Sequence, residues 1–127
     1  MGNRAVIEFE DESANGLGIY LHWNGGMDTV KPMLDVAREY GIRSDDYGVA
    51  RLAQMFGNFF GGSLCVGVSI AKRMHRDNYD NGTYVIDKSF NIKERLFMRR
   101  PEQNVYDYNE MKQHIKAIND PFFLKEK

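Results

Sequence analysis

The chain has 127 residues, a formal net charge of −1 and a hydrophobic fraction of 43%, values typical of one folded domain with a single core. Its sequence pI near 6.3 excludes the general basic field by which many proteins capture DNA. We therefore expect a single α+β domain over residues 1–127 that does not bind DNA.

Cysteine and histidine content limits the metal chemistry and the compartment. Cys65 is the only cysteine, so no internal disulfide can form, and the three histidines have no second thiol with which to build a zinc site. The chain begins with a strand pattern rather than a signal-type apolar run, and no apolar run is long enough to span a membrane. We expect a cytoplasmic protein with no metal, no cofactor and no membrane partner.

The first two predicted elements are strands. Residues 5–9 alternate between apolar and other side chains, and residues 17–23 do the same. Asn15-Gly16 between them is a strong turn signal, so the two strands are predicted to form a hairpin. Trp23 falls on the apolar face of the second strand, which predicts a core position more than a stacking platform.

Two helices are predicted next. Apolar residues recur at helical spacing in both segments. Capping and breaking residues mark their ends: Asp28 or Thr29 and Gly41 for the first helix, Ser44 or Asp45 and Gly61-Gly62 for the second. Both helices therefore come between the second and third strands.

Three more strands and a last helix complete the pattern. The strands are predicted over residues 64–70, 83–87 and 90–99, with a polar loop over 71–82. A capping-box spacing at Asp107 and Glu110 begins the helix, and Asn119-Asp120-Pro121 is predicted to end it. The apolar tail Phe122-Phe123-Leu124 is expected to dock on its own domain or on another copy. The predicted fold is an antiparallel five-stranded sheet with two helices inserted between strands 2 and 3 and a C-terminal helix.

The best local candidate for a ligand site follows the second strand. It consists of Trp23, Asn24, Gly25 and Gly26. Glycines let backbone N–H groups approach an anion, and the start of a helix favours negative charge. A tight connection without any ligand explains the same residues, and Asp28 opposes an anion.

Polar candidates elsewhere are Arg51, Asn81, Arg95 and Arg99. Arg95 and Arg99 are predicted to share one face of the fifth strand, where two guanidinium groups and a ring can hold phosphates and a base. A solvated face or a subunit contact accounts for them equally well. Arg51 lies one position off the apolar stripe of the second helix, and a turn fully explains Asn81-Gly82. No catalytic residue is assigned, because the chain shows no kinase, hydrolase or nuclease signature.

Several short segments together resemble a family of small phage proteins, the first Thoeris anti-defence family. The resemblance covers residues 3–99 and rests on layout and on four segments: Ile19–Gly26, Asp46–Ala53, Gly57–Gly62 and Asp77–Tyr84. It implies a non-enzymatic sponge that acts in the host bacterial cytoplasm and sequesters cyclic ADP-ribose isomers without degrading them. It also implies a homo-oligomer, from a dimer to a hexamer, with ligand pockets between protomers. Some members also bind cyclic oligonucleotides at separate sites.

The resemblance carries Arg51, Asn81, Arg95 and Arg99 over as pocket residue types, together with Trp23 and Asn24. Three alternatives stay open. The chain could instead inhibit a host protein by direct binding through exposed aromatic residues. It could be a small nucleotide-acting enzyme, with His22 or His75 as the general base. An RNA-binding sheet is disfavoured by the acidic pI and the lack of an RNP-type aromatic motif.

Overall fold

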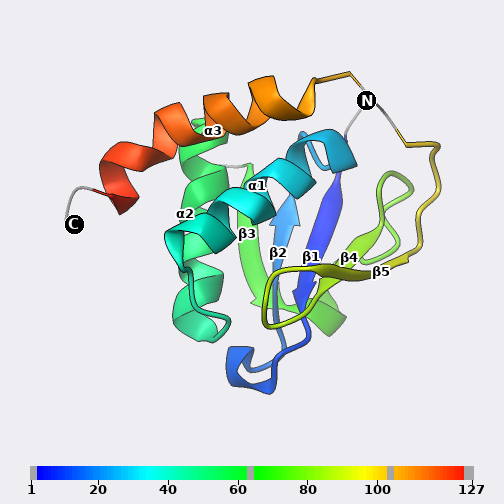
Figure 1. Ribbon diagram of the computed structural model, residues 1–127. Coiled ribbons are helices and arrows are strands. Elements are labelled where there is room, and N and C mark those ends of the chain that lie inside the picture. The colour runs from blue at the N-terminus through cyan, green and yellow to red at the C-terminus, as the bar shows by residue number, and fades with distance from the viewer. Residues whose placement is uncertain (1–2, 63–64, 103–104, 125–127) are drawn as a thin grey trace.

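The computed structural model describes residues 3–62, 65–102 and 105–124, which form an α+β fold with three helices and a five-stranded sheet. The strands are β1 (Ala5–Phe9), β2 (Leu17–Leu21), β3 (Val66–Ile70), β4 (Thr83–Ile86) and β5 (Ile92–Leu96). The helices are α1 (Met27–Tyr40), α2 (Asp46–Phe60) and α3 (Tyr108–Phe123). Short 3-10 turns occur at Glu12–Ala14 (η1) and Ala71–Arg73 (η2). All three α-helices lie on one side of the sheet (Figure 1).

The sheet is mixed, which corrects the prediction of a purely antiparallel sheet. Its strand order is β3-β2-β1-β4-β5, and β1 pairs with β4 in parallel, with Ile7 opposite Tyr84. The other three pairings are antiparallel, including the predicted hairpin of β1 and β2. The parallel pair arises because residues 71–82 run back along the sheet before β4 begins. Thr83 therefore enters beside Val6 rather than beside β3.

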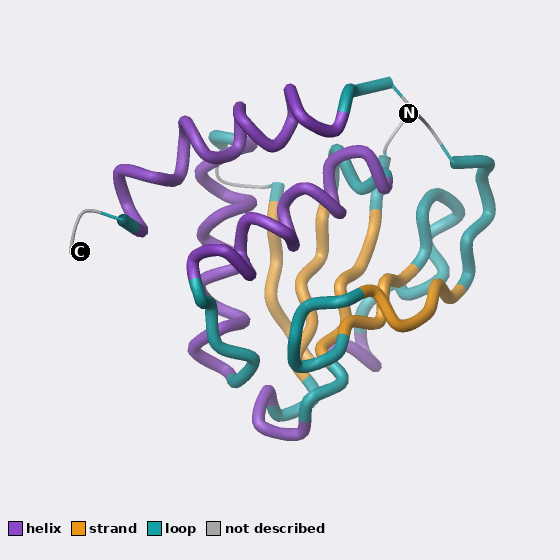
Figure 2. Tube along the Cα trace, in the orientation of Figure 1, coloured by secondary structure: helices purple, strands orange, loops and turns teal. Residues whose placement is uncertain are grey.

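Residues 71–82 lie against the central part of the sheet face that the helices leave open (Figure 2). Val6 and Thr83 lie on this face and are fully buried, and Val85 is nearly so. β1 is therefore largely buried on both faces, although alternation of the kind seen in residues 5–9 is typical of a strand with one buried face. Residues 71–82, which the sequence predicts to be a polar loop, thus bury the second face of the central strand β1.

The main core lies between the sheet and the helices. Ile7, Ile19, Leu21 and Ile86 face it from the strands, and Leu34, Leu52 and Phe56 face it from the helices. Phe9 and Phe90 meet edge to face with ring centroids 5.8 Å apart. Each of the core residues from the strands and helices named here is essentially inaccessible to solvent. This packing holds α1 and α2 against one face of the sheet. The N-terminal end of α1 and the C-terminal end of α2 then lie near the end of β2.

The predicted helix ends agree with the structure at four positions, Gly41, Asp45, Gly61 and Asp107, and differ at two. Gly41 closes α1 in a left-handed conformation with a φ of 73°, and Asp45 caps α2 by accepting a hydrogen bond from the amide of Gly48. Asp107 caps α3 in the same way through Glu110. α1, however, begins at Met27 with Gly26 as its N-cap, earlier than predicted.

α3 continues through Pro121 to Phe123, so the prediction that Pro121 ends the helix is wrong. A proline this close to the last residue removes only one hydrogen bond from the helix, which packing can offset. The packing comes from Phe123, whose ring stacks on Tyr40 of α1 with centroids 5.1 Å apart. Phe123 of the apolar tail therefore docks on its own domain, while Phe122 stays 57% exposed.

β2, β4 and β5 end earlier than predicted, and in β2 and β5 this moves candidate residues off the sheet. β2 ends at Leu21, so Trp23 lies beyond the strand and is 43% exposed rather than part of the core. β5 ends at Leu96 because Phe97 adopts a φ of 58°, a left-handed conformation that breaks the strand. Arg99 is therefore not on the same strand face as Arg95.

Candidate functional site

A cleft of about 400 Å³ opens beside the predicted loop, where the end of β2, the end of α2 and the start of α3 meet. We call it the aromatic slot. Its lining residues are Asn24, Phe59, Val105, Tyr106, Asp107, Glu110, Met111 and His114. Of the predicted site residues, only Asn24 lines it.

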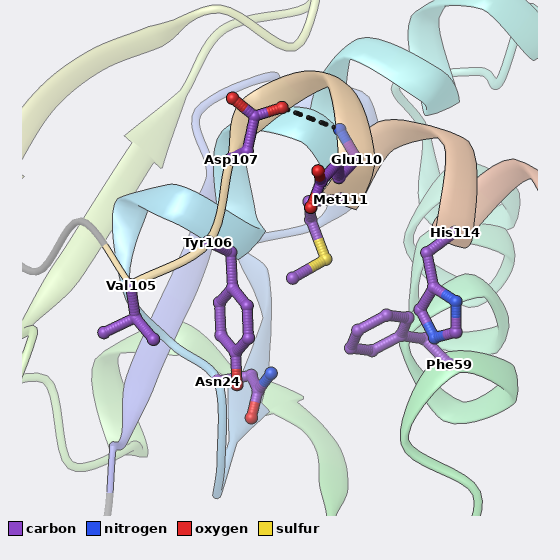
Figure 3. A pocket seen from close by; sticks show the side chains of 8 residues that line it. All are labelled: Asn24, Phe59, Val105, Tyr106, Asp107, Glu110, Met111 and His114. Carbon is purple, nitrogen blue, oxygen red and sulfur yellow. Dashed lines mark hydrogen bonds between the residues drawn. The ribbon is translucent and has the colours of Figure 1, made fainter.

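The side chains of the slot form two aromatic walls with a polar base (Figure 3). The ring of Tyr106 stands on one side, and the rings of Phe59 and His114 stand on the other. The centroids of Phe59 and His114 are 5.4 Å apart in an edge-to-face arrangement. Met111 points between the two walls, and Asn24 lies near the hydroxyl end of Tyr106. Such an arrangement suits a planar ring with a polar edge.

The backbone around Asn24 is held in place by its neighbours in space. Asn24 has a φ of 52°, a left-handed conformation that asparagine tolerates better than most residues. The next residue, Gly25, donates its N–H to the carbonyl oxygen of Asn3 at 2.7 Å. A Cβ atom at Gly25 would lie 2.6 Å from both the Cβ of Ala5 and the oxygen of Asn3, so only glycine fits. The N–H of Gly25 therefore serves the fold, contrary to the prediction that it binds a ligand.

Three of the predicted site residues are connected through Tyr84. It contacts Gly25 and Arg95 directly, and Arg95 in turn contacts Asn81. Its hydroxyl donates to the carbonyl oxygen of Gly25 at 2.7 Å, and the Arg95 guanidinium carbon lies 3.9 Å from its ring centroid. Arg95 also donates to the carbonyl oxygen of Asn81 at 3.1 Å. Burial raises the pKa of Tyr84, so its hydroxyl stays protonated and able to donate. These contacts form a support beneath the Asn24–Gly26 loop.

Arg95 and Asn81 are occupied by this support. The side chain of Arg95 is 14% exposed and pairs with Glu102 at 2.9 Å. The amide of Asn81 donates to the side chain of Asn3 at 2.6 Å and to the carbonyl oxygen of Arg4 at 3.1 Å. Arg95 also lies on the sheet face that carries Tyr84, rather than on an open face, because the two residues are cross-strand partners.

The remaining predicted arginines lie away from the slot. Arg99 donates to Asp77 at 2.9 Å, and this pairing raises the pKa of Arg99. Arg51 is exposed near the start of α2 and lines a separate cleft with Tyr47 and Phe123. Within the described part of the chain, Arg51 has no hydrogen-bond or ion-pair partner. The predicted site residues thus fall into several separate groups rather than one pocket.

Sequence reasoning missed the aromatic walls of the slot. Phe59 reads as part of the apolar stripe of α2, and Tyr106 precedes a capping box in a segment without periodicity. His114 stands on α3 one turn after Glu110, which is the only sequence signal that places both on one helix face. Their common location depends on how α3 crosses the end of α2 (Figure 1).

The polar rim of the slot has a defined electrostatic character. Asp28 accepts hydrogen bonds from the backbone N–H groups of Val105 and Tyr106, which holds the Tyr106 wall near the start of α1. Asp107 uses one oxygen to cap α3. Just outside the slot, a hydrogen bond to Asp35 and partial burial raise the pKa of Tyr108 to about 12. The lining side chains therefore offer the carboxylates of Asp107 and Glu110 and the hydroxyl of Tyr106, and they include no lysine or arginine.

Other kinds of site have no support in the described residues. No group of three or more histidine, cysteine, aspartate or glutamate side chains is placed to hold a metal ion. None of the described helices combines the length and the apolar character needed to cross a bilayer. Comparisons with protein-family profiles, curated protein sequences and solved structures found no match.

Proposed function

We propose that the chain is a nucleotide sponge, which binds a cyclic ADP-ribose isomer in the aromatic slot and holds it without converting it. One observation supports the proposal most: the ring of Tyr106 lies across a cleft of about 400 Å³ from the rings of Phe59 and His114. That volume lies in the usual range for small-molecule pockets, roughly 300–1,000 Å³. A purine between two aromatic walls gains stacking energy that does not need a basic protein.

The polar groups of the slot match the other parts of such a ligand. The amide of Asn24 can both donate to and accept from a base edge. The carboxylates of Asp107 and Glu110 on the rim can accept hydrogen bonds from ribose hydroxyls. The same carboxylates repel phosphates. In the proposed complex the phosphates of the ligand therefore lie outside the slot, on the side of His114.

A second copy of the chain would supply the missing positive charge. The resemblance to the anti-defence family implies pockets completed between protomers. Arg51 is the predicted arginine that has no partner among the described residues, and it lies on the exposed surface of α2. In this proposal Arg51 of one copy neutralises phosphates bound at the slot of another. The action would be that of a phage protein that removes an immune signal inside the host cell.

Catalysis is disfavoured by the way the slot is built. His114 is the only histidine in the slot, and it makes no hydrogen bond to Asp107, Glu110 or any other carboxylate that the structure describes. A general base usually requires such an orienting partner. His22, proposed for the enzyme alternative, lies 2.9 Å from the Tyr20 hydroxyl and does not line the slot. His75 does not line the slot either, because it belongs to another cleft.

Calorimetry with cyclic ADP-ribose isomers tests the proposal directly. Fluorescence gives a second readout. The only tryptophan, Trp23, is exposed next to Asn24, so its emission should change when the ligand binds. Heat-released ligand should be recovered intact by chromatography. Recovery of a converted product would instead establish an enzyme. Absence of binding to any isomer would leave direct inhibition of a host protein as the alternative to pursue.

Two variants identify the slot as the binding site. Tyr106→Ala removes one wall and should weaken binding about tenfold or more, because stacking contributes about 1–3 kcal/mol per base. Asn24→Gly removes the amide but keeps the left-handed backbone. Tyr79→Ala is the matched control, since Tyr79 is 73% exposed and lies outside the slot. Equal affinity in the Tyr106 variant and the control would place the ligand elsewhere.

A further inference from the structure

The sheet face opposite the helices carries a second cleft, which the proposed function does not use. It has a volume of about 390 Å³ and is lined by Tyr20, Arg73, Met74 and His75. Tyr20 projects from β2, while the other three residues belong to the segment that crosses this face. None of these four residues lines the aromatic slot.

The crossing segment is anchored closely to the sheet at its start. A Cβ atom at Gly18 would lie 2.9 Å from the Cβ of Ala71 and 3.0 Å from the carbonyl oxygen of Ile7. The absence of a side chain at Gly18 therefore lets η2 approach the strand directly. Ala71 is 1% exposed and donates its N–H to the carbonyl oxygen of Gly16 at 2.9 Å.

The same segment is anchored again after His75. The amide of Asn78 donates to the carbonyl oxygen of His75 at 3.1 Å, and the hydroxyl of Thr83 donates to that of Arg76 at 3.0 Å. Asn78 is itself 1% exposed. The side chains of Arg73 and His75 therefore project from a backbone that is held on both sides.

The charges around this cleft are unbalanced. The stretch from Ala71 to Arg76 contains Lys72, Arg73 and Arg76 and no carboxylate. Carboxylates of the adjoining segments are already paired: Glu8 with Arg76 at 3.0 Å, Asp80 with Arg4 at 2.8 Å, and Asp77 with Arg99 at 2.9 Å. Across the described residues, neither the side chain of Arg73 nor that of His75 has a hydrogen-bond or ion-pair partner. The cleft thus presents a guanidinium and an imidazole ring whose polar atoms have no side-chain partner in the described part of the chain.

We propose that this cleft binds the phosphate group of a phosphomonoester. The Arg73 guanidinium, a ring N–H of His75 and the Tyr20 hydroxyl would be its donors. The Tyr20 oxygen lies 2.9 Å from Nδ1 of His22. When His22 carries a proton on Nδ1 it donates to Tyr20, which leaves the hydroxyl proton for the phosphate.

A monoester suits this cleft better than a diester does. A phosphomonoester carries close to two negative charges near neutral pH, whereas a diester carries one. The three terminal oxygens of a monoester also match the three donors of the cleft, which come from Arg73, His75 and Tyr20. The cleft also lacks the paired aromatic walls of the slot, so it favours a compact anionic group over a base.

Titration of ¹⁵N-labelled protein with glycerol 3-phosphate tests this site. The backbone amide signals of residues 71–76 should shift saturably, while equal ionic strength of sodium chloride should not shift them in the same way. Arg73→Gln should weaken binding about tenfold or more, as expected for loss of a charge-assisted hydrogen bond. Lys88→Gln is the matched control, since Lys88 is an exposed cation that does not line this cleft.

The experiment has outcomes that would overturn the proposal. One is an unchanged affinity in Arg73→Gln, and a second is a chloride titration that reproduces the shifts. A third is equally tight binding of a cyclic phosphodiester at residues 71–76. A titration with inorganic phosphate is compared with that of glycerol 3-phosphate. Equal affinities mean that the cleft recognises the phosphate group alone. A higher affinity for the ester means that the cleft recognises the organic group as well. Cyclic ADP-ribose isomers carry no monoester, so a negative result here leaves the slot proposal standing.

Discussion

The hydroxyl of Tyr84 on β4 donates a 2.7 Å hydrogen bond to the carbonyl oxygen of Gly25, which lies beyond the end of β2. These residues are 59 positions apart in the chain. Tyr84 is fully buried, and Gly25 is the neighbour of Asn24 in the slot. The bond therefore connects the parallel strand pair at the centre of the sheet to the candidate site.

Tyr84→Phe should lower the free energy of unfolding by about 1–3 kcal/mol, because it leaves a buried carbonyl oxygen without a donor. It should also weaken nucleotide binding in the slot, since the loop carrying Asn24 loses a support. Chemical denaturation and calorimetry measure the two effects. Tyr40→Phe is the control: it removes a hydroxyl bonded to Asp120 and so costs stability, but it leaves the slot unchanged. Equal ligand affinity in the two variants would contradict a positioning role for Tyr84.

Gly25→Ala and Gly57→Ala should change stability in opposite directions. A methyl group at Gly25 meets Ala5 and the Asn3 oxygen at 2.6 Å, and this overlap should cost about 1–3 kcal/mol. A methyl group at Gly57, inside α2, meets nothing within 4 Å. Alanine should stabilise the helix there by about 0.5–1 kcal/mol. Thermal unfolding of the two variants checks both signs, and destabilisation by Gly57→Ala would contradict the packing described for α2.

Asp80 should make the protein less stable in acid. Burial acts to raise the pKa of Asp80, but hydrogen bonds from the side chain and backbone of Arg4 outweigh it and lower the pKa below its usual value of 3.8. The pKa is thus lower in the folded than in the unfolded chain. Its contribution to stability is therefore present above about pH 4 and is lost as the pH falls through the folded value.

Asp80→Asn should accordingly reduce the unfolding free energy at pH 7 and have less effect near pH 2. Urea unfolding at both pH values measures the difference. Asp46→Asn serves as the control, because Asp46 is exposed and has no ion-pair partner among the described residues. A deficit in Asp80→Asn that is the same at both pH values would show that the carboxylate charge is not the stabilising element.

Asn119 should be essential for the contact between α2 and α3. It is fully buried, donates to the carbonyl oxygens of Ile115 and Met55 at 3.2 and 3.4 Å, and accepts from Asn58 at 3.0 Å. Asn119→Ala removes these three bonds from a buried position, leaves the Asn58 amide without this partner, and should cost about 2 kcal/mol or more. Because α2 carries Phe59 and α3 carries His114, nucleotide affinity should fall as well. Denaturation together with calorimetry tests this, and Asn58→Ala, which removes one bond at a half-buried position, should cost less.

Local structure could be predicted well from the sequence. The Asn15-Gly16 turn and the caps at Gly41, Asp45 and Asp107 all depend on residues within a few positions of one another. Backbone conformation and side-chain capping at these positions are local properties. The end of β5 was placed too late because nothing in the local sequence signals the positive φ of Phe97.

The candidate site could be predicted only in part. Asn24 was identified from a strand end followed by two glycines, and it does line the slot. Arg95 and Asn81 were identified by residue type, but the structure pairs them with Glu102 and Asn3. Whether a polar side chain is satisfied within the protein depends on contacts between distant segments, which one sequence does not reveal.

The sequence by itself determined the α+β class, because the periods of strands and helices are written into each segment separately. The tertiary structure alone decided three things: the parallel pairing of β1 with β4, the aromatic walls around Asn24, and the arginine left unmatched at position 73. All three follow from the path of residues 71–82 across the sheet and from the crossing of α3 over α2. The side chains that meet there are up to 90 positions apart, as Asn24 and His114 are, and only the packing of the whole core brings them together.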